Sequence, residues 1–151
     1  MLHFEGDKDF AIPPAALWPK LSDARFLIQC IPEIQSVSRA EADAAVFKIR
    51  PGLSFVPGTL TVELRLVPNV ADQAVGVWTR SKGIGSSADV VAGFSLAPLD
   101  QGTRVHWTTE IQALGGLLKA VPQGLIQAAA QKVIVDLWSG IAARAQERDE
   151  G

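Results

Sequence analysis

Apolar and polar residues alternate along most of the chain up to Ile111, as they do in strands that bury one face. The clearest alternation lies at 59–66, and its apolar face consists of Leu60, Val62, Leu64 and Leu66. The same pattern predicts further strands at 2–12, 34–38, 45–50, 75–82, 88–96 and 105–111. Turn sequences such as Asp100-Gln101-Gly102 join these runs, so we expect neighbouring strands to pair antiparallel.

Two short helices are predicted directly after the first strand. Pro13-Pro14 ends that strand, and proline suits the first turn of a helix. Ser22-Asp23 has the composition of an N-cap, which favours a second helix over 25–30. Ile31-Pro32 then ends this second helix.

After Gly115-Gly116 the apolar spacing changes from that of a strand to that of a helix. The residues expected on the buried face of this helix are Leu118, Val121, Leu125, Ala129, Val133, Leu137 and Ile141. Pro122 lacks a backbone donor and should kink or restart the helix, leaving a main body near 123–147. That body would be about 35 Å long, enough to lie across a sheet. We therefore predict one α+β domain over residues 1–151.

A curved sheet closed by one helix often leaves space between the two layers, and we expect an apolar cavity there. Small or hydroxylated residues on the inward phase, such as Thr79 and Ala92, favour a gap over tight packing. The predicted cavity wall consists of Phe47, Leu60, Val62, Val77, Thr79, Ala92, Phe94, Trp107, Thr109, Leu125 and Ala129. Trp107 tests this assignment, because a register shift of one residue would place it on the outer face.

Composition narrows the function classes. Hydrophobic residues make up 48% of the 151 residues, and the mean hydropathy of +0.19 exceeds what a minimal core needs. The net charge of −2 gives no basic field for nucleic acid. A single cysteine excludes a disulfide framework. No segment has the layout of a signal peptide or a membrane span, so we expect a cytoplasmic protein.

Motifs along nearly the whole chain resemble those of the CoxG family of carbon monoxide dehydrogenase proteins, within the START-like (SRPBCC) helix-grip superfamily. The residues that carry the resemblance are Phe4-Glu5-Gly6, Pro13-Pro14 with Trp18, Cys30-Ile31-Pro32, Pro57-Gly58-Thr59, Lys82-Gly83, the small-residue strand through Gly93, Gly102-Thr103-Arg104-Val105-His106-Trp107 and the closing helix. Each motif is short, and the weight lies in their order and spacing.

The resemblance implies a helix-grip fold, in which a curved seven-stranded antiparallel sheet wraps around the C-terminal helix and encloses a tunnel for an apolar ligand. It also implies lipid or quinone binding and recruitment of a molybdenum-type carbon monoxide dehydrogenase to the membrane. Contact would then be peripheral, at the inner face of the membrane. The superfamily also contains cyclases and hydrolases, so the fold alone does not fix a function.

Lys8 lies on the same strand phase as Phe4 and Phe10, where an apolar residue is expected. A buried lysine is costly unless it is paired. One interpretation is that its side chain extends past the end of the sheet to solvent. The alternative places the cation at the cavity mouth, where it would meet a carboxylate, phosphate or quinone oxygen.

Other chemically suggestive residues have simpler interpretations. Cys30 lies at a helix end with no base beside it in sequence, so a structural role is favoured. His3 and His106 lie on the polar phase of the first and last strands, and a metal site there would need further ligands. The glycine-rich stretch 82–87 has no helix after it and is interpreted as a hairpin.

The apolar loop between two strands is predicted to form the cavity entrance together with the start of the closing helix. The residues assigned to this entrance are Leu53, Phe55, Val56 and Pro122. Folding of the loop back onto the helix is the alternative. Trp78 lies on the predicted outer phase, where a membrane, a partner protein or a second copy in a homodimer would cover it.

No Ser-His-Asp order, catalytic carboxylate pair or HExxH stretch is present in the sequence. The favoured hypothesis is therefore a non-catalytic carrier of a quinone- or lipid-like molecule that requires no cofactor and serves a membrane-linked oxidoreductase. The alternative is a small enzyme of the cyclase or hydratase type, with Lys8 or a cavity-facing threonine as its polar group.

Overall fold

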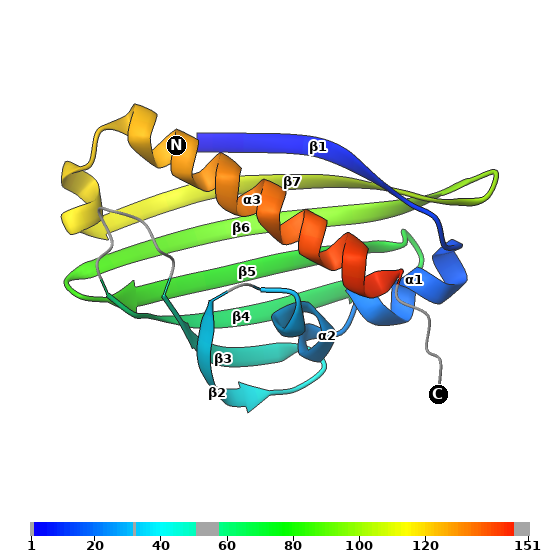
Figure 1. Cartoon of the computed structure of the whole chain (residues 1–151), viewed down its shortest axis with the longest axis horizontal. Coiled ribbons are helices and arrows are strands. Elements are labelled where there is room, and N and C mark those ends of the chain that lie inside the picture. Colours follow the sequence, from blue (N-terminus) through cyan, green and yellow to red (C-terminus); the bar gives the residue numbers. More distant parts are fainter. Residues whose placement is uncertain (1, 32, 51–57, 147–151) are drawn as a thin grey trace.

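A computed structural model of the chain describes residues 2–31, 33–50 and 58–146, and shows one sheet with helices on one of its faces (Figure 1). The elements in chain order are β1 (Leu2–Phe10), α1 (Pro14–Leu21), α2 (Ala24–Gln29), β2 (Ile34–Ala40), β3 (Ala44–Ile49), β4 (Leu60–Asn69), β5 (Ala74–Gly83), β6 (Ser86–Leu99), β7 (Gly102–Gly116), the 3-10 helix η1 (Leu117–Ala120) and α3 (Gln123–Ala145). The predicted α+β helix-grip architecture is confirmed.

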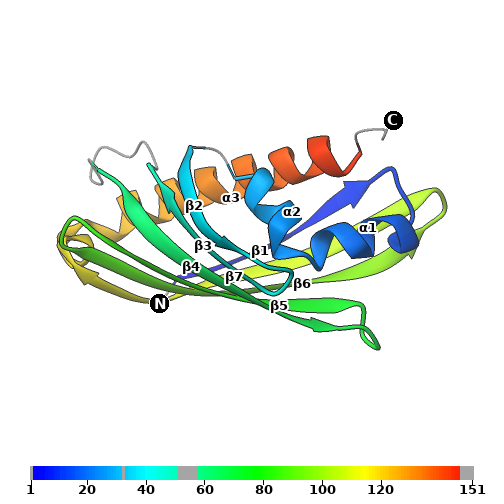
Figure 2. The same cartoon turned by 90° about the horizontal axis from the view of Figure 1, so that it is seen from below.

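The seven strands form one antiparallel sheet in the order β1-β7-β6-β5-β4-β3-β2. Consecutive strands from β2 to β7 are hydrogen-bonded neighbours, as short hairpin connections dictate. β1 instead joins the far edge, beside β7, so the first and last strands lie together. All three α-helices lie on the same side of the sheet, and no described element covers the other side (Figure 2).

α1 and α2 close one end of the sheet. α1 starts at Pro14, and its Leu17 and Leu21 are fully buried. Asp23 caps α2, because its carboxylate accepts a hydrogen bond from the Arg25 backbone N–H at 2.9 Å. Thr103, on β7, donates its buried hydroxyl to the carbonyl of Ile12 at 2.8 Å. The N-terminal connection is therefore held against the last hairpin.

α3 begins directly after Pro122 and runs diagonally across the sheet (Figure 1). Its buried residues are Ile126, Ile134, Trp138, Ile141, Ala142 and Ala145. The predicted helix face is therefore wrong over its first half, where Leu125 and Val133 are 54% and 47% exposed. Apolar residues occur on every side of this helix, so spacing alone does not select the face that packs against the sheet.

The described core has two parts. The larger cluster joins α1, α2 and the second half of α3 to one end of the sheet, around Phe10, Phe94 and Trp138. The smaller cluster consists of Leu60, Leu118 and Ile126, and closes the other end beneath η1. Between these two clusters lies the middle of the inner sheet face.

Candidate functional site

The middle of the inner sheet face is only half-buried, although it lies beneath α3. Strand parity places Val77 and Thr79 of β5 on the same side as the buried Val75. The same parity places Ala92 of β6 and Thr109 of β7 inward, and these two residues pair with each other. All four side chains are partly accessible, whereas the clusters on either side of them are packed. The structure thus contains an incompletely filled apolar space between α3 and the sheet.

This space is lined without charge. Among the described residues, the inward positions of β3 to β7 carry no Asp, Glu, Lys or Arg. Hydroxyls supply its polarity, and the Thr79 hydroxyl donates to the carbonyl of Val90 at 3.4 Å. Ser86, also on the inward phase, is 6% exposed and its hydroxyl has no hydrogen-bond partner in the described structure. Such a surface suits a neutral molecule with few polar groups.

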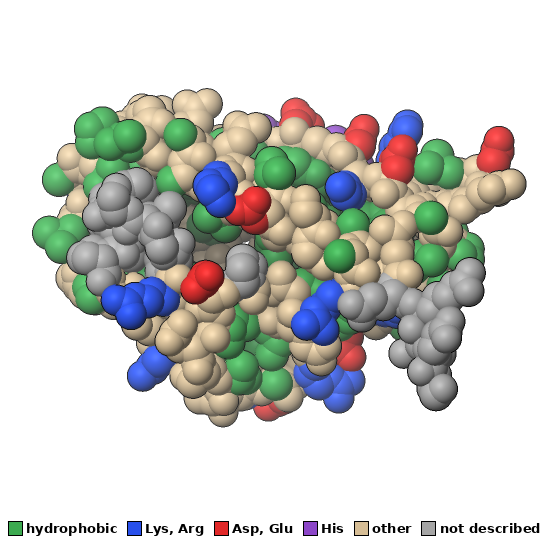
Figure 3. All heavy atoms as spheres, in the orientation of Figure 1, with side chains coloured by type: hydrophobic (Ala, Val, Ile, Leu, Met, Phe, Trp, Pro, Cys, Tyr) green, Lys and Arg blue, Asp and Glu red, His purple; other side chains and the backbone are tan. Residues whose placement is uncertain are grey.

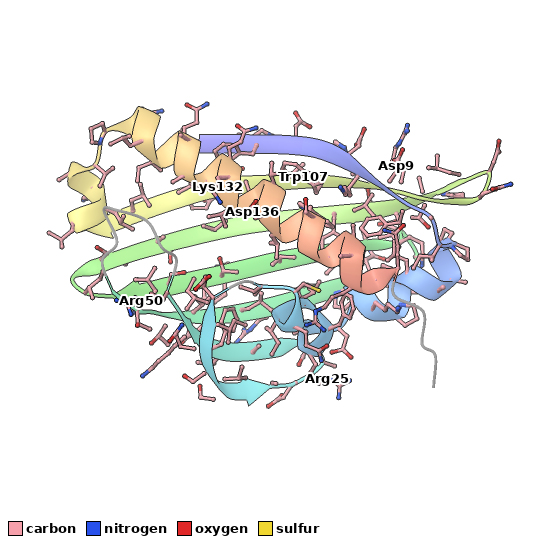
Figure 4. All side chains as sticks on the ribbon, in the orientation of Figure 1. Asp9, Arg25, Arg50, Trp107, Lys132 and Asp136 are labelled. Atoms are coloured by element: carbon pink, nitrogen blue, oxygen red, sulfur yellow. The ribbon has the colours of Figure 1, made fainter. Side chains whose placement is uncertain are left out.

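Aromatic rings form the end of this space that faces the larger cluster. Trp107 lies on the inner face of β7 beneath α3 (Figure 4) and stacks on Trp138, with ring centroids 6.4 Å apart. Phe94 meets Trp138 edge-on at 5.7 Å. Gly6, opposite Trp107 on β1, leaves room for the indole, because a Cβ there would lie 2.8 Å from its Cζ2 atom. A larger residue at position 6 would displace the Trp107 ring.

The predicted wall residues divide into three groups in the structure. Phe47, Leu60, Val62 and Phe94 are buried in the packed clusters. Val77, Thr79, Ala92, Trp107, Thr109 and Ala129 are half-buried. The assignment of Leu125 to the wall is wrong, because this side chain points away from the sheet, and Ile126 occupies the inward position instead.

The sequence patterns used above do not single out Trp138, which contacts Phe10, Phe94 and Trp107. A second helical series, one position on from the chosen one, runs through Ile126, Ile134 and Trp138. That series is present in the sequence and is the signal that identifies this residue.

Openings to this space lie along α3. One groove of about 290 Å³ runs between α3 and the β1–β7 edge and includes Phe4, Trp107 and Ile134. Another of about 270 Å³ lies at the start of α3, between Ile111, Leu118 and Ile126. The surface is also hollowed beside Lys132 and Asp136 (Figure 3), whose ion pair measures 2.6 Å.

The predicted entrance residues Leu53, Phe55 and Val56 lie outside the described residues. Pro122, the fourth, is exposed at the N-cap of α3.

The remaining chemical candidates lie away from this space or have structural surroundings. Lys8 faces inward on β1, is half-buried, and makes no ion pair within the described ranges. Cys30 is buried at the end of α2. His106 lies on the outer face, with Nδ1 2.7 Å from the Asp7 carboxylate. Within the described part of the chain, no group of His, Cys, Asp and Glu could hold a metal ion.

No helix among the described residues is both long and apolar enough to cross a membrane. A family model for CoxG, the G-type subunit of carbon monoxide dehydrogenase, matches residues 6–146. A comparison with curated proteins found no match.

Solved structures share the fold over almost the whole chain. A conserved protein from Geobacillus kaustophilus is 19% identical, with a TM-score of 0.83 and 95% of each chain covered. The Zhui aromatase/cyclase from Streptomyces sp. R1128 is 15% identical, with a TM-score of 0.74, covering 99% of this chain and 98% of its own. A START superfamily protein from Mycobacterium smegmatis is 12% identical, with a TM-score of 0.63, covering 95% of this chain and 97% of its own. At these identities the likeness shows the fold alone.

Proposed function

The chain belongs to the CoxG family of carbon monoxide dehydrogenase proteins, and from this premise we propose that it carries a neutral apolar molecule, quinone- or lipid-like, between α3 and the sheet. The observation that carries the proposal is the half-open, uncharged inner face around Thr79, Ala92 and Thr109. An anionic ligand would have no cation in the middle of this face. A neutral carbonyl or ester needs only a hydroxyl donor, and threonine and serine provide one.

Native mass spectrometry of the protein purified from its own host tests this proposal. We expect a bound neutral lipid or quinone that denaturation releases. Binding of a short-chain quinone, followed by quenching of tryptophan fluorescence, would give the affinity. Trp107 and Trp138 are the reporters, because both lie at the aromatic end of the space. Protein that is empty and that fails to bind either a quinone or a neutral lipid would refute the proposal.

The runner-up function is a small cyclase- or hydratase-type enzyme that uses the same space. Its support is that the Zhui aromatase/cyclase has the same fold, together with the inward hydroxyls and Lys8. Incubation with an aromatic polyketide mimic separates the two functions. Product formation that is lost in Thr109→Val, with binding retained, would favour the enzyme. Binding without turnover favours the carrier.

The surface around η1 supports transient membrane contact as the route by which ligand enters. Ile84 sits at the tip of the β5–β6 hairpin with a φ of +48°, a conformation that costs a β-branched residue free energy. Leu117, which is 60% exposed, lies beside this hairpin at Gly85, and Lys82 and Lys119 flank it. From 111 to 135 the sequence contains no carboxylate. Exposed apolar side chains next to lysines suit an anionic membrane interface.

Sedimentation with anionic phospholipid vesicles tests the membrane contact. We expect Leu117→Asp to weaken binding about tenfold, since it places a charge among lipid tails. Val70→Asp is the matched control, because Val70 is 68% exposed on the β4–β5 hairpin at the opposite end of β5. Equal loss in both variants, or in neither, would contradict this contact surface. Recruitment of a molybdenum-type dehydrogenase to the membrane remains part of the same proposal, with co-sedimentation of the two proteins as its test.

A further inference from the structure

The sheet face opposite α3 has an exposed apolar strip at its centre. Val67 on β4 and Val91 on β6 are 63% and 42% exposed. Trp78 on β5 is half-buried beneath the Arg80 guanidinium, which lies 5.3 Å from its ring. Gly76 and Gly93 pair directly, so the backbone between these side chains is bare. Figure 2 shows no described helix on this side of the sheet.

Charges of opposite sign flank this strip along one row of paired residues. The register joins Arg65 to Trp78, Trp78 to Val91, and Val91 to Glu110. Arg65 and Glu110 are three strand spacings apart, about 14 Å, so they do not meet within one chain. Neither makes an ion pair among the described residues.

We propose that this face is the interface of a symmetric dimer of the chain. A two-fold axis parallel to the strands, between β5 and β6, lays the row over its own copy in reverse order. Arg65 then faces Glu110 of the partner subunit, and Trp78 faces the partner's Val91. In the next row Gly76 faces the partner's Gly93, which allows the two sheets to approach at their centres. An axis across the strands would instead set Arg65 against itself.

A second copy fits this face better than a membrane does. Asp89, Glu110 and Glu63 lie on it beside Arg80 and Arg65, and an anionic bilayer would repel those carboxylates. Arg80 holds Asp89 at 2.9 Å while covering Trp78, so the central side chains are positioned before association. Face-to-face packing of two sheets buries an apolar centre within a polar rim, and this face has both. The proposal is independent of which ligand the inner space binds.

Charge reversal tests the interface in sedimentation velocity runs over a range of protein concentrations. Wild type should show a reversible dimer. Arg65→Glu opposes two carboxylates at each of the two equivalent contacts and should raise the dimer dissociation constant about tenfold or more. Glu110→Arg opposes two guanidinium groups and should do the same. Lys119→Glu, a charge reversal on η1, is the control and should leave the dissociation constant unchanged.

Mixing the two single variants gives the decisive result. In the mixed dimer each reversed charge faces its opposite, so the mixture should dimerise as wild type does while each variant alone does not. Both substitutions are on strand faces open to solvent, and far-UV circular dichroism checks that each variant is folded. A wild type that is monomeric up to about 1 mM, a dimer insensitive to either reversal, or a mixture that stays monomeric would each overturn the proposal.

Discussion

Filling the inner space from Ala92 should block ligand without weakening the fold. Ala92 lies on β6 between Val77 of β5 and Thr109 of β7 in the sheet register, and all three face α3. Ala92→Leu adds three carbon atoms at the centre of the half-open region. If that region is unfilled, the new side chain enters existing room and moves no neighbour.

The two possible outcomes differ in sign. Burial of apolar carbon contributes about 0.8 kcal/mol per methylene, so the leucine could add up to about 2 kcal/mol to the free energy of unfolding. In a packed core the same atoms would cost about 1–3 kcal/mol. For a domain of this size each 1 kcal/mol shifts the melting temperature by about 2–4 °C. The difference is well within the reach of thermal unfolding.

Ala45→Leu is the matched control, since Ala45 is 1% exposed inside the larger cluster. We expect it to lower the melting temperature by several degrees, whereas Ala92→Leu keeps or raises it. Quinone binding should fall at least tenfold in Ala92→Leu, because the added carbons occupy the ligand's place. If Ala92→Leu loses as much stability as Ala45→Leu, the inner face is packed and the carrier has no binding space there.

Three further predictions concern stability. Trp138→Ala should lower the free energy of unfolding by about 3–5 kcal/mol in denaturant titrations, since it removes the ring shared by Phe10, Phe94 and Trp107; a loss below about 1 kcal/mol would contradict that packing. Gly6→Ala should cost about 1–3 kcal/mol and change the near-UV dichroism of tryptophan, because its Cβ would collide with Trp107; an unchanged spectrum would place the indole elsewhere. Asp23→Ala should cost about 1 kcal/mol through loss of the α2 cap, against no effect of Asp100→Ala on a hairpin turn. The hydrogen bond from Arg25, followed by those of the cap, lowers the pKa of the Asp23 carboxyl below 3.8, so its contribution is complete above that pH and is lost as the pH falls through the lower folded-state pKa. The difference in stability between wild type and Asp23→Ala should therefore shrink only in strong acid.

The strands and their inward phases were predictable because each buries one face only. Alternation placed Val62, Thr79 and Trp107 on the inner side, and the structure has all three there. The division of that side into packed and open regions was not predictable. Whether an inward residue such as Phe94 is enclosed depends on what α3 places above it, and strand parity does not contain that information.

The orientation of α3 could not be derived because both of its candidate faces are apolar. Where one face of a helix is polar, burial selects the other, but here Leu125 and Ile126 are equally suited to the core. The choice follows from tertiary contacts: Trp138 fills the space between Phe10, Phe94 and Trp107, and a rigid helix then turns Ile134 and Ile126 inward as well. The same rotation leaves Leu125 and Val133 on the surface. Apolar side chains left outside by such a choice have no packing role, so their retention is best explained by contact outside the chain, and their nearness to Leu117 and Ile84 favours the membrane surface proposed above.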